Sequence, residues 1–312
     1  MTKYASELPD FADLVRAVAQ SRNLPPAIVE KDYFLTRALN GLASNHQGLF
    51  LLKGGTSLSK GWDLLDRFSE DIDLLLKIEF DGRPISKGER ERRMKQICST
   101  VAATVDFTQT EGKYPAERCV HRTAEFSYRT FVEDLTGLGK TVKLEIGTRG
   151  GVHPTATRTV HSFLTRYIQE KGLADLAEDL SGFELEMLDV KRTFVEKLFA
   201  VEGAFVENRA ANRTRHYYDL YKLCELSEIQ DFAGTAEYCE ISADVERYSR
   251  EHFPNTSLPQ PAELARSEAF NPKADDLRAL ERHYREERHL FFVEPPPFAK
   301  ILERIHTLRP RL

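Results

Sequence analysis

The sequence predicts an α+β protein in which a mixed α/β half precedes an all-helical half. Residues 49–52 form a short, fully apolar run that is typical of a buried strand. Residues 122–131 and 141–147 read as two strands joined by a glycine-bearing connection. From about residue 160 the strand signals end and helical patterns dominate. We therefore expect two domains, 1–155 and 156–312, with a soft boundary near Gly150-Gly151.

Length and composition describe a globular protein. The chain has 312 residues, which corresponds to roughly two domains at about 150 residues each. No apolar run approaches the ~18 residues of a membrane span, and the first ten residues lack the apolar core of a secretory signal. The four cysteines have no paired spacing, which favours a reducing cytoplasm over a disulfide framework or a zinc site. The net charge is −5, so a polyanionic partner would need a local basic patch.

The first half contains a strand, a turn and a helix in succession. A helix is expected to begin near Pro25-Pro26 and to close between Gly41 and Gly48, before the apolar strand. That strand ends at Gly54-Gly55. Thr56 or Ser57 is suited to cap a helix that we expect to continue to Leu65. A second strand follows, in which Asp71 and Asp73 alternate with apolar residues.

The glycine turn has the composition of a phosphate site. Gly54 and Gly55 leave room for an anion to approach the backbone amides, and a helix N-terminus follows at once. Thr56, Ser57 and Lys60 add two hydroxyls and an ammonium. Taken alone, a Gly-Gly-Thr-Ser sequence is more often an ordinary turn between a strand and a helix.

Two carboxylates follow about a dozen residues later. Asp71 and Asp73 lie two apart on a strand, so both project from one face and can share a divalent cation such as Mg²⁺. Glu145, on the polar face of the later strand, is the candidate third carboxylate if the two strands are neighbours. Phosphoryl-type transfer uses this combination of amides and metal-binding carboxylates. The alternative for Asp-x-Asp alone is a solvated strand face.

The helical half contributes one lysine of interest. Residues 190–207 place an apolar stripe along a helix, with Lys197 at its edge. A lysine in that position either extends to water or reaches into a cleft to bind a phosphate.

A basic segment follows in residues 191–222. It holds seven Lys or Arg against four acids, and three tyrosines at 217, 218 and 221 lie within it. Such a patch can contact RNA, or the tyrosines can simply be core. Within it, Arg215 and Asp219 are spaced to form an i,i+4 pair, for which a structural ion pair is the alternative to a functional role.

Together these segments resemble the AbiEii/AbiGii family of nucleotidyltransferase toxins, which includes the MenT-type enzymes. The resemblance extends in order from about residue 25 to residue 225. It rests on these segments: Glu30-Lys-Asp-Tyr33, Lys53-Gly-Gly-Thr-Ser-Leu-Ser-Lys60, Arg67-Phe-Ser-Glu-Asp-Ile-Asp-Leu74, Val142-Lys-Leu-Glu-Ile146, Glu196-Lys-Leu-Phe-Ala200 and Arg215-His-Tyr-Tyr-Asp-Leu220.

The resemblance implies a polymerase-β-like nucleotidyltransferase core with a helical C-terminal domain. It implies transfer of a nucleotide from an NTP with Mg²⁺, to the 3′ acceptor end of tRNA in MenT-type members, which blocks translation. It also implies a toxin–antitoxin or phage-defence module with an antitoxin encoded by an adjacent gene.

Carried to this sequence, the resemblance gives roles to individual residues. Ser57 and Lys60 would bind triphosphate, and Asp71 and Asp73 would bind metal. Lys197 and Asp219 would be the family's essential lysine and late aspartate. Ser69 matches a serine that some relatives have phosphorylated.

The sequence therefore predicts a Mg²⁺-dependent nucleotidyltransferase of the cytoplasm. Two other classes share these features: a catalytically silent module that binds NTP, RNA or a partner protein, and a kinase-type phosphotransferase. The residues do not specify the NTP, the acceptor, the antitoxin or the oligomeric state.

Overall fold

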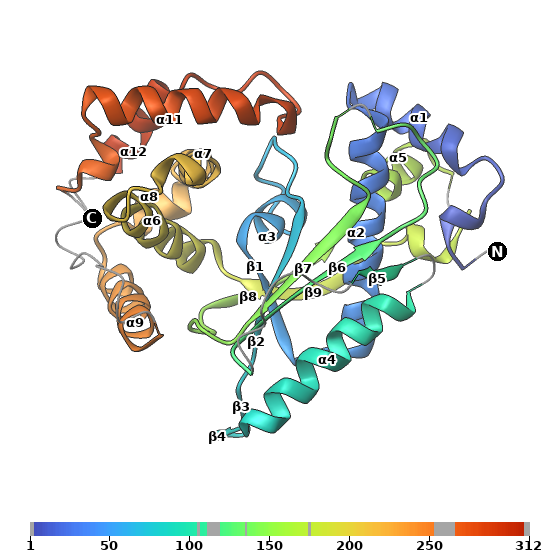
Figure 1. The fold of residues 1–312 in the computed structure, drawn as a ribbon, viewed down its shortest axis with the longest axis horizontal. Coiled ribbons are helices and arrows are strands. Elements are labelled where there is room, and N and C mark those ends of the chain that lie inside the picture. Colours follow the sequence, from blue (N-terminus) through green and yellow to red (C-terminus); the bar gives the residue numbers. More distant parts are fainter. Residues whose placement is uncertain are drawn as a thin grey trace. The chain divides into compact units, whose positions relative to one another are not determined.

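A computed structural model of the chain describes residues 3–104, 107–110, 119–134, 136–173, 176–252 and 266–308. It confirms the α+β class, with a seven-stranded mixed sheet and many helices (Figure 1). The helices are α1 (Phe11–Arg22), α2 (Pro26–Asn45), α3 (Gly54–Lys60), α4 (Lys87–Ala103), α5 (Phe163–Lys171), α6 (Val190–Val206), α7 (Thr214–Leu223), α8 (Ser227–Phe232), α9 (Ala236–His252), α11 (Ala274–Glu286) and α12 (Phe298–Leu308). The strands are β1 (Phe50–Lys53), β2 (Asp71–Leu76), β3 (Glu79–Phe80), β4 (Arg83–Pro84), β5 (Thr108–Thr110), β6 (His121–Ser127), β7 (Thr141–Gly147), β8 (Thr155–Val160) and β9 (Phe183–Leu188).

The chain divides into two compact units. The sheet unit comprises Met1–Asp63, Phe68–Thr148 and Ala156–Met187, and the helical unit comprises Leu64–Arg67, Arg149–Thr155 and Leu188–Leu312. This division differs from the expected boundary at residue 155, because α5 and β9 belong to the sheet unit.

Strand β9 explains that difference. Leu185 and Met187 are buried while Glu184 is exposed, so the segment alternates as a strand does. Met187 pairs with Leu52 in a parallel ladder, which extends the sheet well beyond residue 160, where strand signals were expected to end.

No helix among the described residues is long and apolar enough to cross a membrane.

The sheet has the strand order β5-β6-β7-β2-β1-β9-β8. Neighbouring strands β5/β6, β6/β7 and β1/β2 are antiparallel, whereas β2/β7 and β1/β9 are parallel. The expected pair of strands at 122–131 and 141–147 is therefore confirmed as β6 and β7. The parallel ladder between β2 and β7 is the pairing that matters most for the site, because it sets the Asp-x-Asp strand beside the strand carrying Glu145.

One face of the central strands forms the core of the sheet unit. Ile72 and Leu74 of β2 and Val142, Leu144 and Ile146 of β7 are fully buried. Helix α2 packs against both strands, and α4 packs against β6. In Figure 1 the helices α1, α2 and α5 lie together in this unit, as their mutual contacts require. The alternate residues of β2 and β7 face away from this core.

Helix α2 carries four consecutive buried polar residues, Glu30-Lys31-Asp32-Tyr33. The carboxylate of Glu30 accepts from the amides of residues 131 and 132, and Lys31 donates to the carbonyl of Leu138 at 2.6 Å. Tyr33 donates to Asp179 at 2.6 Å. Each side chain ties α2 to a different segment, so this motif holds the sheet unit together.

Asp32, the third residue of this motif, is paired with Lys60. The two side chains are 1% and 8% exposed, and the carboxylate of Asp32 also accepts from the amide of Phe163 at 2.7 Å. Burial lowers the pKa of the Lys60 ammonium, against the attraction of Asp32. The pair joins α2, α3 and the start of α5.

Helix α3 is shorter than expected, because it ends at Lys60 rather than near Leu65. It begins at Gly54 with Lys53 as its N-cap, and no side chain caps it. The next residues explain the early end, because Leu64–Arg67 belong to the helical unit. The amide of Phe292 donates to the carbonyl of Asp66 at 2.9 Å, which fixes this short segment there.

Helix α6 forms the centre of the helical unit. It contacts α7, α8 and α9. Four residues of the expected apolar stripe are fully buried, namely Val190, Phe194, Leu198 and Val201, whereas the fifth, Phe205, is half-buried. Tyr217, Tyr218 and Tyr221 are also buried, so the tyrosines of the basic segment belong to the core. On α11 only Leu280 and Tyr284 are buried, as expected for a largely solvated helix.

Replacing Lys60 by Met should lower the free energy of unfolding by about 3–5 kcal/mol, because it leaves the Asp32 carboxylate buried without its cation. Urea unfolding measures this change, and the double variant Asp32→Asn/Lys60→Met should recover part of the loss. Arg166→Met is the matched control: it removes a pair with Asp63, whose side chain is 67% exposed, and should cost no more than about 1 kcal/mol. Equal losses for the two single variants would contradict the role of the buried pair.

Candidate active site

Two aspartates lie on the face of β2 that points away from the core. Asp71 and Asp73 alternate with buried Ile72 and Leu74, and both are half-buried. The expectation that the two carboxylates share one face of a strand is thereby confirmed.

The parallel register between β2 and β7 adds two charged residues to this face. Lys143 lies opposite Asp71, and Glu145 lies opposite Asp73. Paired residues on neighbouring strands project to the same side, so the four side chains form one patch. We call Asp71, Asp73, Lys143 and Glu145 the acidic strand face. Lys53, at the end of β1, lies opposite Asp73 on the other side.

Lys143 is the cation within the acidic strand face. Its ammonium contacts the carboxylate of Glu145 and lies 4.0 Å from Asp71 Oδ2. Among the described residues no group of three His, Cys, Asp or Glu side chains is arranged to hold a metal ion. Asp71 and Asp73 provide the hard oxygen donors that Mg²⁺ prefers. The ammonium of Lys143 provides a positive charge beside these carboxylates.

Burial and neighbouring acids perturb Asp71. Burial raises the pKa of its carboxyl to about 6, the charge of Lys143 opposes this rise, and Asp73, Glu70 and Glu145 add to it. A carboxylate that resists ionisation in this way gains most from a nearby cation. The face is therefore short of positive charge.

Gly54 makes room for Asp73. Its backbone is left-handed, with φ +72°, and a Cβ at this position would lie 2.4 Å from Asp73 Oδ2. Glycine adopts this conformation without strain and has no side chain to displace the carboxylate. The Asp73 carboxylate thus occupies space that a side chain at position 54 would fill.

Thr56 and Ser57 are fully buried, and their hydroxyls bond within the protein. Thr56 Oγ1 donates to the carbonyl of Asp71 and lies 3.0 Å from Ser69 Oγ, while Ser57 Oγ donates to the carbonyl of Gly54 at 2.9 Å. The bond from Thr56 ties α3 to the start of β2, and the bond from Ser57 lies within α3. Lys60 is likewise paired with Asp32, so the three side chains expected to contact triphosphate all bond within the protein in this structure. The amides of Gly54 and Gly55 lie in the first turn of α3, where they have no partner within the helix.

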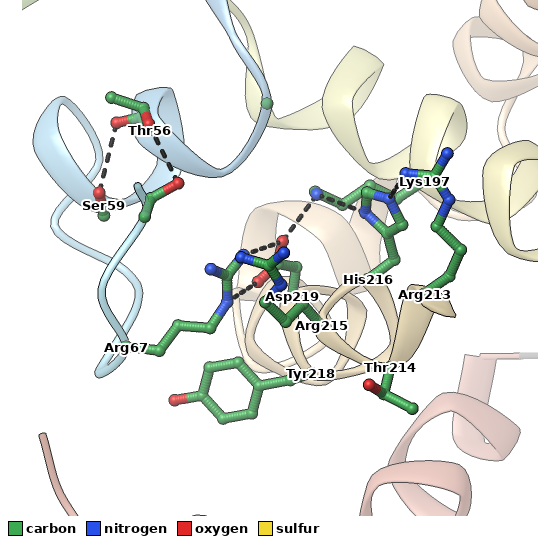
Figure 2. A network of polar contacts seen from close by, with 12 residues as sticks. Thr56, Ser59, Arg67, Lys197, Arg213, Thr214, Arg215, His216, Tyr218 and Asp219 are labelled. Atoms are coloured by element: carbon green, nitrogen blue, oxygen red, sulfur yellow. Dashed lines mark hydrogen bonds and ion pairs between the residues drawn. The ribbon is translucent and has the colours of Figure 1, made fainter. Parts of the chain in front are cut away.

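A second polar cluster lies in the helical unit and contains Lys197 and Asp219 (Figure 2). Asp219 is 1% exposed; its two oxygens accept from Arg67 Nε at 2.8 Å and Arg67 Nη2 at 2.7 Å. Asp219 Oδ2 also accepts from Lys197 Nζ at 2.7 Å, and this ammonium lies 3.1 Å from Nδ1 of His216. We call Arg67, Lys197, His216 and Asp219 the Asp219 cluster.

The charges of this cluster keep the carboxyl of Asp219 ionised. Burial opposes its ionisation, but Arg67 and Lys197 outweigh burial and hold the pKa of its carboxyl well below the usual range. Asp219 therefore stays ionised, with both oxygens engaged by cations. Asp219 in turn orients the Arg67 guanidinium and the Lys197 ammonium.

Arg215 differs from the sequence expectation of an ion pair with Asp219. Its Nε lies 3.1 Å from Glu287 Oε1, while Arg67 and Lys197 hold Asp219. The pairing with Arg67 joins residues 152 positions apart, which helical periodicity does not report.

Sequence reasoning gave no role to four of these residues: Lys53, Arg67, Lys143 and His216. Each of the four nevertheless lies inside a segment that carries the family resemblance, which was the available signal.

Comparisons with known proteins give a matching family model and a similar solved structure. A family model described as the nucleotidyl transferase AbiEii toxin, type IV TA system, matches residues 37–304. The solved structure of the nucleotidyltransferase toxin MenT4 from Mycobacterium tuberculosis H37Rv has the same fold. It aligns with a TM-score of 0.54 and 15% sequence identity over 95% of this chain and 99% of the other. Comparison with curated proteins gives no significant match.

Replacing Gly54 by Ala should weaken divalent-cation binding roughly 10–100-fold, because the new Cβ displaces Asp73. Titration with Mn²⁺ measures the affinity. Gly48→Ala is the matched control: Gly48 has φ +77° and nothing within 4 Å of the added Cβ, so it carries a similar backbone strain of about 1–2 kcal/mol without touching an acid. Equal Mn²⁺ affinity in the two variants would contradict the inference that Gly54 leaves room for the Asp73 carboxylate.

The pKa of Asp71 predicts how stability depends on pH in the metal-free protein. A raised pKa stabilises the fold below the ordinary value of 3.8, and this contribution is lost as the pH rises through about 6. Asp71→Asn should therefore unfold at a higher urea concentration than the wild type at about pH 8, with a smaller difference at about pH 5. Unfolding in EDTA tests this, with the exposed Asp231→Asn as control. A difference that does not grow with pH would contradict the raised pKa.

Proposed function

Because this chain belongs to the AbiEii family of nucleotidyltransferase toxins, we propose that it transfers a nucleotide from an NTP to the 3′ end of tRNA, which would block translation. The observation that carries the proposal is the acidic strand face. It combines Asp71 and Asp73 on one face of β2, Glu145 in register beside them and the glycine turn against Asp73.

Asp71 and Asp73 are the residues proposed to hold Mg²⁺. Their oxygens suit a hard cation, and the raised pKa of Asp71 means that a cation would relieve an existing electrostatic cost. Bound there, the metal would supply charge for the α-phosphate and for the attacking hydroxyl. Glu145 is proposed as an additional carboxylate once Lys143 releases it.

The nucleotide phosphates are proposed to bind the amides of Gly54 and Gly55. Thr56, Ser57 and Lys60 hold that turn in place through the buried bonds described above. Lys197, oriented by Asp219, is proposed to neutralise charge on the triphosphate and on the departing pyrophosphate. Such groups stabilise charge that develops in the transition state without needing to reorganise.

RNA binding is proposed for the basic segment 191–222, with Arg215 among its cations. The exposed Arg209 and Arg213 are suited to phosphate contacts, whereas the buried tyrosines are not placed to stack on bases. The family's type IV toxin–antitoxin description supports an antitoxin partner, which we propose is encoded by an adjacent gene. The cytoplasm is the proposed compartment.

Incubation with Mg²⁺, total tRNA and each labelled NTP tests the proposed reaction. Label should enter RNA with the wild type, and Asp71→Ala or Asp73→Ala should reduce transfer at least about 100-fold, because each removes a proposed metal ligand. Glu184→Gln, an exposed acid on β9 of the same sheet, is the matched control and should leave transfer unchanged.

The products separate this proposal from its alternatives. Pyrophosphate release accompanies nucleotidyl transfer, whereas release of a nucleoside diphosphate would indicate a kinase. Mg²⁺-dependent NTP binding without any product would indicate a binding module. Transfer by Asp71→Ala at a near wild-type rate would overturn the assignment of the acidic strand face.

A further inference from the structure

We propose that His216 is a positioning residue whose neutral imidazole accepts a hydrogen bond from Lys197 and thereby aims the remaining N–H of that ammonium at a phosphate oxygen. The inference deepens the proposed function and rests on it. It concerns one residue of the Asp219 cluster, within the helical unit.

The ammonium of Lys197 has three N–H donors, and protein acceptors lie in two directions from it. Asp219 Oδ2 lies 2.7 Å away and His216 Nδ1 lies 3.1 Å away. An ammonium held by a single acceptor can still rotate about its terminal bond, but two acceptors fix all three N–H directions. Lys197 is 4% exposed, so little water is available to replace either partner. The third N–H is therefore directed by Asp219 and His216 together.

The tautomer of His216 follows from its two cationic neighbours. Lys197 approaches Nδ1 at 3.1 Å, and Arg213 Nη1 approaches Nε2 at 3.4 Å. A neutral imidazole has only one accepting nitrogen. The shorter contact belongs to the buried lysine, whereas the side chain of Arg213 is exposed and can donate to water. Nδ1 is therefore the acceptor, and the proton is on Nε2.

The surroundings of His216 keep it neutral. Desolvation and the charge of Lys197 lower the pKa of the imidazole well below its ordinary 6.5, and Arg213 and Arg67 act in the same direction against Asp219. These charges come from α6, from the 3₁₀ turn at residues 210–213, from the segment before β2 and from α7. A protonated ring would present a donor to the ammonium and lose the bond.

Three substitutions separate positioning from packing. His216→Asn retains an acceptor near the position of Nδ1, His216→Gln moves its amide outward towards the position of Nε2, and His216→Ala removes the acceptor. We expect the Gln and Ala variants to raise KM for the NTP and to lower kcat, reducing kcat/KM roughly tenfold, because Lys197 is no longer aimed at the bound triphosphate or at the departing pyrophosphate. The Asn variant should stay within about threefold of the wild type.

Two measurements do not depend on nucleotidyl transfer. Nitrogen NMR of histidine-labelled protein should show Nδ1 of His216 unprotonated at neutral pH. Inorganic tripolyphosphate should bind the wild type and His216→Asn alike, and should bind His216→Gln, His216→Ala and Lys197→Ala more weakly. If these results hold while no RNA is labelled, the proposed reaction fails and the positioning role stands. A protonated Nδ1, or equal tripolyphosphate binding by all five proteins, would overturn the inference.

Discussion

The sheet unit depends on the buried polar residues of α2. Burying a charge without a partner is costly, so each of these side chains fixes the segment that supplies its partner. Glu30 bonds to the segment that follows β6, and Lys31 bonds to the segment that precedes β7. Asp32 bonds to both α3 and α5. A single helix thus sets the positions of the glycine turn and of the strands that carry the carboxylates. The charged residues of this part of α2 therefore have a structural role within the sheet unit.

The two clusters place carboxylates in opposite electrostatic states. On the acidic strand face, burial and neighbouring acids raise the pKa of Asp71, which leaves that face short of positive charge. In the Asp219 cluster, Arg67 and Lys197 outweigh burial and keep Asp219 ionised. Environments that shift like groups in opposite directions are a mark of divided roles. The first carboxylate is suited to receive a cation and the second to hold one that the protein already supplies.

Sequence reasoning found the local features of this molecule and missed the long-range ones. Alternation in β2 and β7 predicted the common face of Asp71 and Asp73 and the polar side of Glu145, because a strand's period is visible in its own residues. The partner of Lys60 lies 28 residues away, and that of Arg67 lies 152 away, at distances where no periodicity applies. Strand β9 was missed because helical patterns surround it. The family resemblance supplied the candidate site residues, and the structure shows which segments several of them hold in place.

The close approach between Gly54 and Asp73 makes residue 54 informative about other members of this family. A homologue that keeps both aspartates but carries a larger residue at the equivalent of Gly54 would have no space for the second carboxylate in this position. An alignment would still show both aspartates, although the second carboxylate could not take the position that it has here. The first glycine of the turn is therefore a sequence marker for separating competent enzymes from degenerate copies, and it reports on the strand acids from outside the strand.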